Sequence, residues 1–171
     1  MNDKQNITVL ERTENIKNML GLLGFSYVGL IYLLMLIIPN TIWALSKPEE
    51  FDTKNENKIF SAFERISQIF CTVTLLFFSD YNPKEFTLWT FWLFLSFAFM
   101  ILYEIYWVRY FKSSRTKYDF YRNLIAIPVP GATLPVVAFL LLGVYGKVIW
   151  LVISSIIFGI GHIGIHINKS I

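Results

Sequence analysis

Five long apolar segments, almost free of charged residues, dominate this chain of 171 residues. A helix needs about 20 apolar residues to cross the hydrocarbon core of a bilayer. The uncharged run 19–38 meets this length, and we expect it to end at Pro39. We expect the other spans at 60–78, 86–108, 124–146 and 148–167. The sequence therefore predicts a single integral-membrane domain, an all-α polytopic transmembrane helix bundle with five spans.

Two of these segments depart from a regular apolar helix. The segment 60–78 reaches spanning length only by including Glu64 and Arg65. The segment 124–146 contains three prolines, Pro128, Pro130 and Pro135. Proline removes a backbone donor and interrupts a helix. The stretch 124–133 is therefore either a broken or re-entrant helix that lines a cavity, or a loop at headgroup level with the helix starting at the second proline or later.

Composition excludes several other classes of protein. Hydrophobic residues make up 55% of the chain and charged residues 16%, and the charges fall in a few blocks. The net charge of +3 is too small and too scattered for nucleic-acid binding, so we expect no nucleic-acid partner. The single cysteine, Cys71, excludes an intramolecular disulfide. Nucleophile elbows, Walker loops and dinucleotide-binding glycine motifs are absent from the sequence.

The distribution of Lys and Arg predicts the orientation. With five spans, the two long connectors and the C-terminus share one side, which carries nine basic residues against five on the other. Basic residues favour the cytoplasmic side. We therefore expect a cell-membrane protein with its N-terminus outside and its C-terminus in the cytoplasm. The basic connector from Arg109 to Arg122 is either a solvated, orienting loop or a site for anionic lipid headgroups.

Most polar residues within the spans belong to one end of the predicted bundle. Because consecutive spans alternate in direction, these residues come to the same level in the membrane, and charged groups at that depth usually face other helices. The candidate binding-pocket residues are Glu64, Arg65, Gln68, Tyr103, Glu104 and Arg109. Glu64, Gln68 and Cys71 share one helical stripe. Glu104 is either a proton-carrying or cation-binding carboxylate, or a packing ion pair with Arg65 or Arg109.

The last segment contains His162 and His166 in the sequence GIGHIGIH. Residues four apart lie on one helical face, so the pair could ligate a metal or a haem if a third ligand such as Glu64 or Glu104 joined them. HxxxH alone is a weak motif. The alternative is a tightly packed helix whose histidines bond to neighbouring carbonyls or water.

These features favour a small-solute or proton-linked binding or transport module, with a polar pocket near the cytoplasmic face. One alternative is a membrane-embedded enzyme that acts on a lipid-soluble substrate through His162 and His166. Another is a non-catalytic accessory or immunity-type protein that binds a second membrane protein. The chain is small for a complete transporter, which favours a homo-oligomer if it transports.

Overall fold

The computed structural model describes residues 20–46 and 58–170, and this part of the chain is all-α. Its six α-helices are α2 (Tyr27–Leu45), α3 (Lys58–Phe77), α4 (Phe91–Lys112), α5 (Lys117–Tyr121), α6 (Pro130–Gly146) and α7 (Ile149–Ser170). Three stretches of the described residues are long and apolar enough to cross a membrane: Tyr27–Leu45, Leu88–Lys112 and Ile149–Ile167. Pro130–Gly146 is a shorter apolar helix. The predicted all-α fold is confirmed for these residues, and the chain has candidate transmembrane helices.

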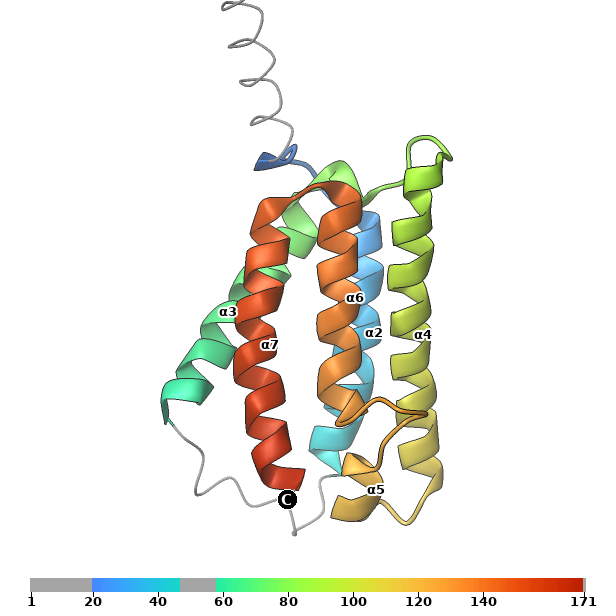
Figure 1. Ribbon diagram of the computed structural model, residues 1–171, viewed down its shortest axis with the longest axis vertical. Coiled ribbons are helices and arrows are strands. Elements are labelled where there is room, and N and C mark those ends of the chain that lie inside the picture. Colours follow the sequence, from blue (N-terminus) through green and yellow to red (C-terminus); the bar gives the residue numbers. More distant parts are fainter. Residues whose placement is uncertain (1–19, 47–57, 171) are drawn as a thin grey trace, which may run out of the picture.

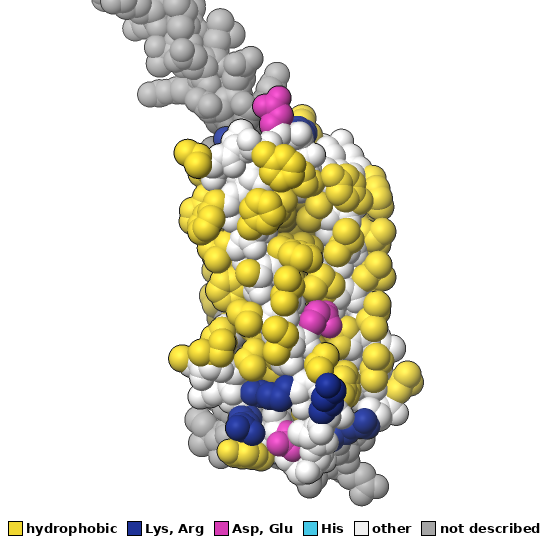
Figure 2. Space-filling view, turned by 90° about the vertical axis from the view of Figure 1, so that its right-hand side faces the viewer, with side chains coloured by type: hydrophobic (Ala, Val, Ile, Leu, Met, Phe, Trp, Pro, Cys, Tyr) yellow, Lys and Arg dark blue, Asp and Glu magenta, His cyan; other side chains and the backbone are white. Residues whose placement is uncertain are grey.

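The five long helices run roughly side by side (Figure 1). α4 packs along α6, α6 along α7, and α7 along α3, while α2 contacts both α3 and α4. The short helix α5 lies at the end of the bundle where α4 ends and α6 begins. Hydrophobic side chains cover the middle of the face in Figure 2, and Lys and Arg side chains gather at its lower end. We call this end of the bundle the basic end.

The helix α2 does not follow the predicted boundaries of 19–38. Residues before it pair with the end of α3, where the amides of Gly24 and Ser26 donate to the carbonyls of Phe77 and Leu76, each at 2.9 Å. Backbone groups used in these bonds are unavailable to a helix, so α2 begins only after Ser26, whose hydroxyl caps the amide of Gly29 at 2.8 Å.

At its other end α2 continues through Pro39 to Leu45, where the sequence predicted a stop. The proline removes the amide that would bond to the Met35 carbonyl, and the rest of the helical hydrogen-bond pattern continues past it. The side chain of the next residue, Asn40, turns back to donate to the Leu36 carbonyl at 2.7 Å. Membrane helices tolerate a proline where neighbouring groups make up for the missing donor. The first helix is consequently displaced along the chain, toward the basic end.

The helix α6 starts at Pro130, in agreement with the second of the two alternatives for 124–133. Leu124 and Ile127 form a tight turn, and Ile125 and Val129 have positive φ angles. Gly131 lies against the Tyr106 ring, because a Cβ there would be 2.9 Å from the tyrosine oxygen. The prolines therefore delay the helix and leave a non-helical connection before it.

The short helix α5 is held by a reciprocal cap. The Thr116 hydroxyl donates to the Asp119 carboxylate at 2.9 Å, and the amide of Asp119 donates back to that hydroxyl at 3.2 Å. The Thr116 side chain, followed by its backbone amide, lowers the pKa of Asp119 below its ordinary value. This carboxylate is therefore ionised at neutral pH and stabilises the cap.

A buried hydrogen-bond chain joins three helices in the core. The Tyr32 hydroxyl of α2 donates to the Ser96 hydroxyl of α4 at 3.0 Å. Ser96 in turn donates to the Ala138 carbonyl of α6 at 2.7 Å. All three residues are buried, so these contacts fix the rotation of α2 relative to α4 and α6.

Candidate functional site

A cavity of about 530 Å³ lies between the five long helices and receives side chains from every one of them. We call it the five-helix cavity. Its inner wall is apolar and buried, and includes Phe139 of α6 and Phe158 of α7, which are 1% and 3% exposed. Six polar residues also line it: Asn40, Thr41, Gln68, Thr72, Tyr103 and His162. An apolar wall with a few convergent polar groups is typical of small-molecule sites.

The cavity is open on the side where α2 and α3 diverge. These helices touch closely near Gly29 and Leu75, and α3 leans away from α2 toward the basic end (Figure 1). The cavity residues on this side, Thr41 of α2 and Gln68 and Thr72 of α3, are exposed. The opening therefore faces sideways out of the bundle, between two neighbouring helices.

Glu64 of α3 and His162 of α7 meet beside the cavity. The Nδ1 atom of His162 lies 2.5 Å from Oε1 of Glu64, and the two side chains are only 17% and 20% exposed. The His162 ring stacks on Phe158 with a centroid distance of 4.7 Å, which fixes its orientation. The pair joins a carboxylate and an imidazole at the border between the cavity and the basic end, and it can hold a shared proton.

Asn40 and Tyr103 form a second polar contact on the cavity wall. The Asn40 amide nitrogen donates to the Tyr103 hydroxyl oxygen at 2.6 Å. Because the tyrosine oxygen accepts this bond, its own proton remains available to a molecule in the cavity. Asn40 was not among the predicted pocket residues. In the sequence, Asn40 is a polar residue within an apolar run. It shares a helical face with Leu33 and Leu36, but only if the helix continues past Pro39.

The six predicted pocket residues do not all meet in one place. Gln68 and Tyr103 line the cavity, and Glu64 contacts His162 at its edge. Cys71 also lines the cavity, as its shared stripe with Glu64 and Gln68 predicts. The other three, Arg65, Glu104 and Arg109, are not among the described residues of the cavity wall.

Glu104 faces a separate groove of about 250 Å³, together with the α2 residues Ile31, Leu34, Met35, Ile38 and Pro39. Its Oε1 atom is shielded and has no hydrogen-bond partner within the described part of the chain. In the described part of the chain, neither Arg65 nor Arg109 forms the predicted ion pair with Glu104. The helix α4 is turned so that Tyr103 points inward and Glu104 toward the α2–α4 groove.

Arg109 has a structural position at the basic end. Its guanidinium donates to the carbonyls of Arg122 and Asn123 at 2.6 and 2.8 Å. It therefore ties the end of α4 to the connection that leads into α6. Arg65, by contrast, is exposed on α3.

The candidate metal ligands His162 and His166 lie next to one another, with ring centroids 4.6 Å apart. His166 also packs against Phe120 and Tyr121 at the basic end. Within residues 20–46 and 58–170 no group of three or more His, Cys, Asp or Glu side chains is placed to hold a metal ion.

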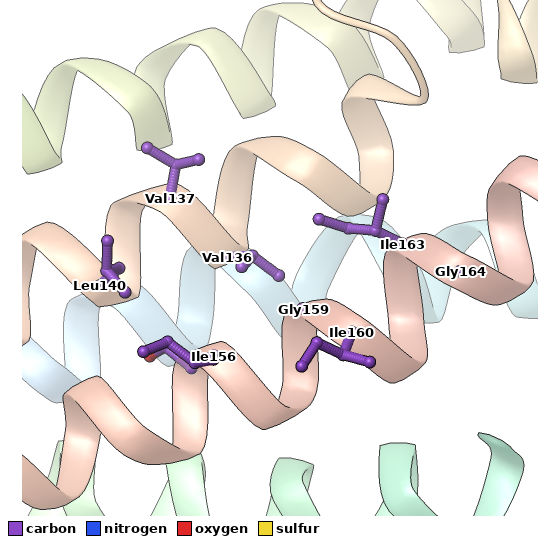
Figure 3. Close-up of a pocket in the computed structure, with 9 residues that line it drawn as sticks. Val136, Val137, Leu140, Ile156, Gly159, Ile160, Ile163 and Gly164 are labelled. Atoms are coloured by element: carbon purple, nitrogen blue, oxygen red, sulfur yellow. The ribbon is translucent and has the colours of Figure 1, made fainter. Parts of the chain in front are cut away.

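A further groove of about 380 Å³ runs along the outside of α6 and α7 (Figure 3). Val136 and Leu140 line one side of it, and Ile156 and Ile160 line the other. Gly159 brings the two helices close together, because a Cβ there would lie 2.9 Å from Val136. None of the described residues lining this groove is charged, so the groove can pack against an apolar surface but supplies no acid, base or metal ligand.

Comparison of the chain with protein-family models, with curated proteins and with solved structures finds no match in any of the three.

Proposed function

We propose that this chain is a five-span membrane protein that binds a small amphipathic solute in the five-helix cavity, with binding linked to protonation of the Glu64–His162 pair. The observation that carries the proposal is the cavity itself, which takes wall residues from all five long helices. The pair at its edge supplies the titrating groups. Transport would require that the same site open to both sides of the membrane.

The wall chemistry supports an apolar body with a hydrogen-bonding head as the ligand. Phe139 and Phe158 offer aromatic surface in the interior of the cavity. The Gln68 amide makes no hydrogen bond within the described residues, and the Tyr103 proton is free to be donated. A molecule that entered between α2 and α3 would therefore bury its chain against the aromatic wall and bond its head to Gln68 or Tyr103.

The Glu64–His162 pair supports the link to protons. Imidazole is the side chain that titrates most readily near neutral pH. Uptake or release of one proton changes the charge of the pair by one unit, and in a partly dry site this change alters the strength of every nearby polar contact. Binding of a ligand head beside His162 would therefore depend on pH.

Photoactivatable probes test the cavity. We expect a diazirine-bearing hexadecanoic acid, or the corresponding amine, to label cavity-facing peptides of α2 and α3 in vesicles. Thr72→Trp places a large ring on the cavity wall and should reduce this labelling about tenfold. Val73→Trp is the matched control, because Val73 is the next residue and is exposed but does not line the cavity. Equal labelling in the two variants would remove the cavity as a ligand site.

The same assay tests the proton link. Labelling by at least one probe should change with pH in the wild type. Glu64→Gln and His162→Gln should each flatten this dependence, whereas His166→Gln should keep it. A pH profile unaffected by both substitutions of the pair would contradict the role given to Glu64 and His162.

The five-span topology is supported by the contacts of α3. The first turns of α3 contain charged residues, so α3 is less apolar than the other long helices. Its Glu64, however, contacts His162 of α7, and this partner lowers the free-energy cost of placing a carboxylate at membrane depth. With five spans, the excess of Lys and Arg places the basic end in the cytoplasm. There Lys117 and Arg122 line a pocket of about 660 Å³ with Tyr118, Tyr121 and Asn123, which fits an anionic lipid headgroup.

Cysteine labelling tests this topology. A membrane-impermeant maleimide applied to intact cells should leave Lys117→Cys unlabelled and should label Lys147→Cys. Both positions are exposed at opposite ends of the bundle, so each is the control for the other. The basic end should also retain phosphatidylglycerol in preference to phosphatidylcholine in native mass spectra, and Lys117→Gln with Arg122→Gln should weaken that preference. Labelling of Lys117→Cys from outside would reverse the orientation.

A further inference from the structure

Two charges of opposite sign lie on the outer surface of the bundle without a partner among the described residues. Arg65 of α3 is exposed and forms no ion pair or hydrogen bond within the described residues. Glu104 of α4 is half-buried, and its Oε1 atom also lacks a partner there. In a membrane-spanning bundle, such groups are costly unless a partner is provided.

Both charges lie beside the part of the bundle that encloses the five-helix cavity. Arg65 follows Glu64, which contacts His162 of α7. His162 lines the five-helix cavity together with Tyr103, and Tyr103 precedes Glu104 in α4. Each charge is thus one residue away from a side chain at or beside the cavity. An ion pair between the Arg65 of one copy and the Glu104 of another would therefore not require the two copies to tilt against each other.

The two charges also lie on opposite sides of α2. Arg65 and Thr72 are seven residues apart and share a face of α3, and Thr72 lines the open side of the cavity beside α2. Glu104 lies in the groove on the other side of α2, next to Leu34 and Ile38. Between them the outer face of α2 is apolar and uncovered, with Leu34 47% and Ile38 54% exposed.

We infer that two copies of this chain pair through the outer faces of α2, around a two-fold axis along the membrane normal. In such a dimer, the side of α2 that is next to α3 in one copy lies opposite the side of α2 that is next to α4 in the other copy. Arg65 of each copy therefore meets the partner subunit's Glu104, and two identical ion pairs flank the apolar contact. This is an isologous interface, which closes after two copies. Pairing satisfies all four charges and covers the exposed Leu and Ile side chains of α2.

A charge swap tests the ion pairs. Arg65→Glu and Glu104→Arg should each lower the dimer association constant about tenfold, because like charges then face each other. The double variant Arg65→Glu with Glu104→Arg should restore dimerisation. Lys112→Glu alters an exposed base on the same helix as Glu104, farther toward the basic end, and should have no effect. The measurement is single-molecule photobleaching of labelled protein in liposomes at graded protein-to-lipid ratios.

Cysteine cross-linking tests the symmetry without changing either charge. In a Cys71→Ala background, Leu34→Cys should cross-link to itself in native membranes, because Leu34 lies near the proposed axis. Ile160→Cys, which is 65% exposed on α7, should not. Three results would each overturn the dimer. The wild type could be monomeric at all protein-to-lipid ratios, the double variant could stay monomeric, or cross-linking could occur at Ile160→Cys rather than at Leu34→Cys. The dimer is measured by photobleaching and cross-linking and the ligand site by probe labelling of Thr72→Trp against Val73→Trp, so each proposal can fail without the other.

Discussion

Replacing Gly29 by valine will prevent assembly of the bundle. A Cβ at this position would lie 1.8 Å from the carbonyl oxygen of Leu75 and 2.6 Å from its carbonyl carbon. Both are backbone atoms, so no side chain can rotate away. Nor can α2 and α3 separate easily, because the adjoining amides of Gly24 and Ser26 donate to the carbonyls of Phe77 and Leu76. Overpacking of this kind costs about 3 kcal/mol or more.

Size-exclusion profiles and thermal unfolding in detergent will measure this effect. We expect Gly29→Val to aggregate and Gly29→Ala to unfold at a clearly lower temperature than the wild type. Gly164→Ala is the control, because no heavy atom lies within 4 Å of a Cβ there. Its midpoint should be unchanged or slightly higher, since alanine favours a helix by about 1 kcal/mol over glycine. A Gly29→Ala protein as stable as the wild type would contradict the close crossing of α2 and α3.

Replacing Arg109 by alanine will loosen the connection between α5 and α6. The guanidinium is the donor for the carbonyls of Arg122 and Asn123. Loss of hydrogen bonds to a charged group costs about 2 kcal/mol. On either side of these two carbonyls the segment is held by the amide of Arg122, which donates to Tyr118, and by the turn between Leu124 and Ile127, so we expect the loosening to stay local. Arg109→Lys keeps the charge but not the two-pronged geometry, and should fall between the wild type and alanine.

Thermal unfolding and hydrogen exchange of peptides covering 122–129 will check this prediction. Lys112→Ala removes a neighbouring base that makes no hydrogen bond among the described residues, and it should leave both readouts unchanged. Faster exchange in Arg109→Ala, with unaltered probe labelling of the cavity, would identify Arg109 as a structural residue. Unchanged exchange would show that the two carbonyls are held by other contacts.

The helices themselves could be predicted because lipid-solvated segments must be apolar over a fixed length. Their ends could not be, because these depend on contacts between distant residues. The residues around Gly24 do not indicate that its amide will donate to the carbonyl of Phe77. Nor does the local sequence show that α2 continues past Pro39 to Leu45.

The level of the polar residues could also be predicted, since consecutive long helices alternate in direction. This reasoning explains why Glu64 and His162 meet although they are 98 residues apart. It could not predict how each helix is rotated about its axis. That rotation is fixed by packing, including the Tyr32–Ser96–Ala138 hydrogen bonds. As a result Tyr103 faces the cavity, whereas the adjacent Glu104 faces the groove outside it.

The crossing of α2 and α3 is fastened at one end only. Near Gly29 the two helices are joined by backbone hydrogen bonds and direct contact, whereas at the basic end they diverge around the cavity. Two helices joined in this way separate from one another most easily at the end where they are not joined. A change in the width of the cavity mouth would then be largest toward the basic end, where Glu64 also ties α3 to His162 of α7.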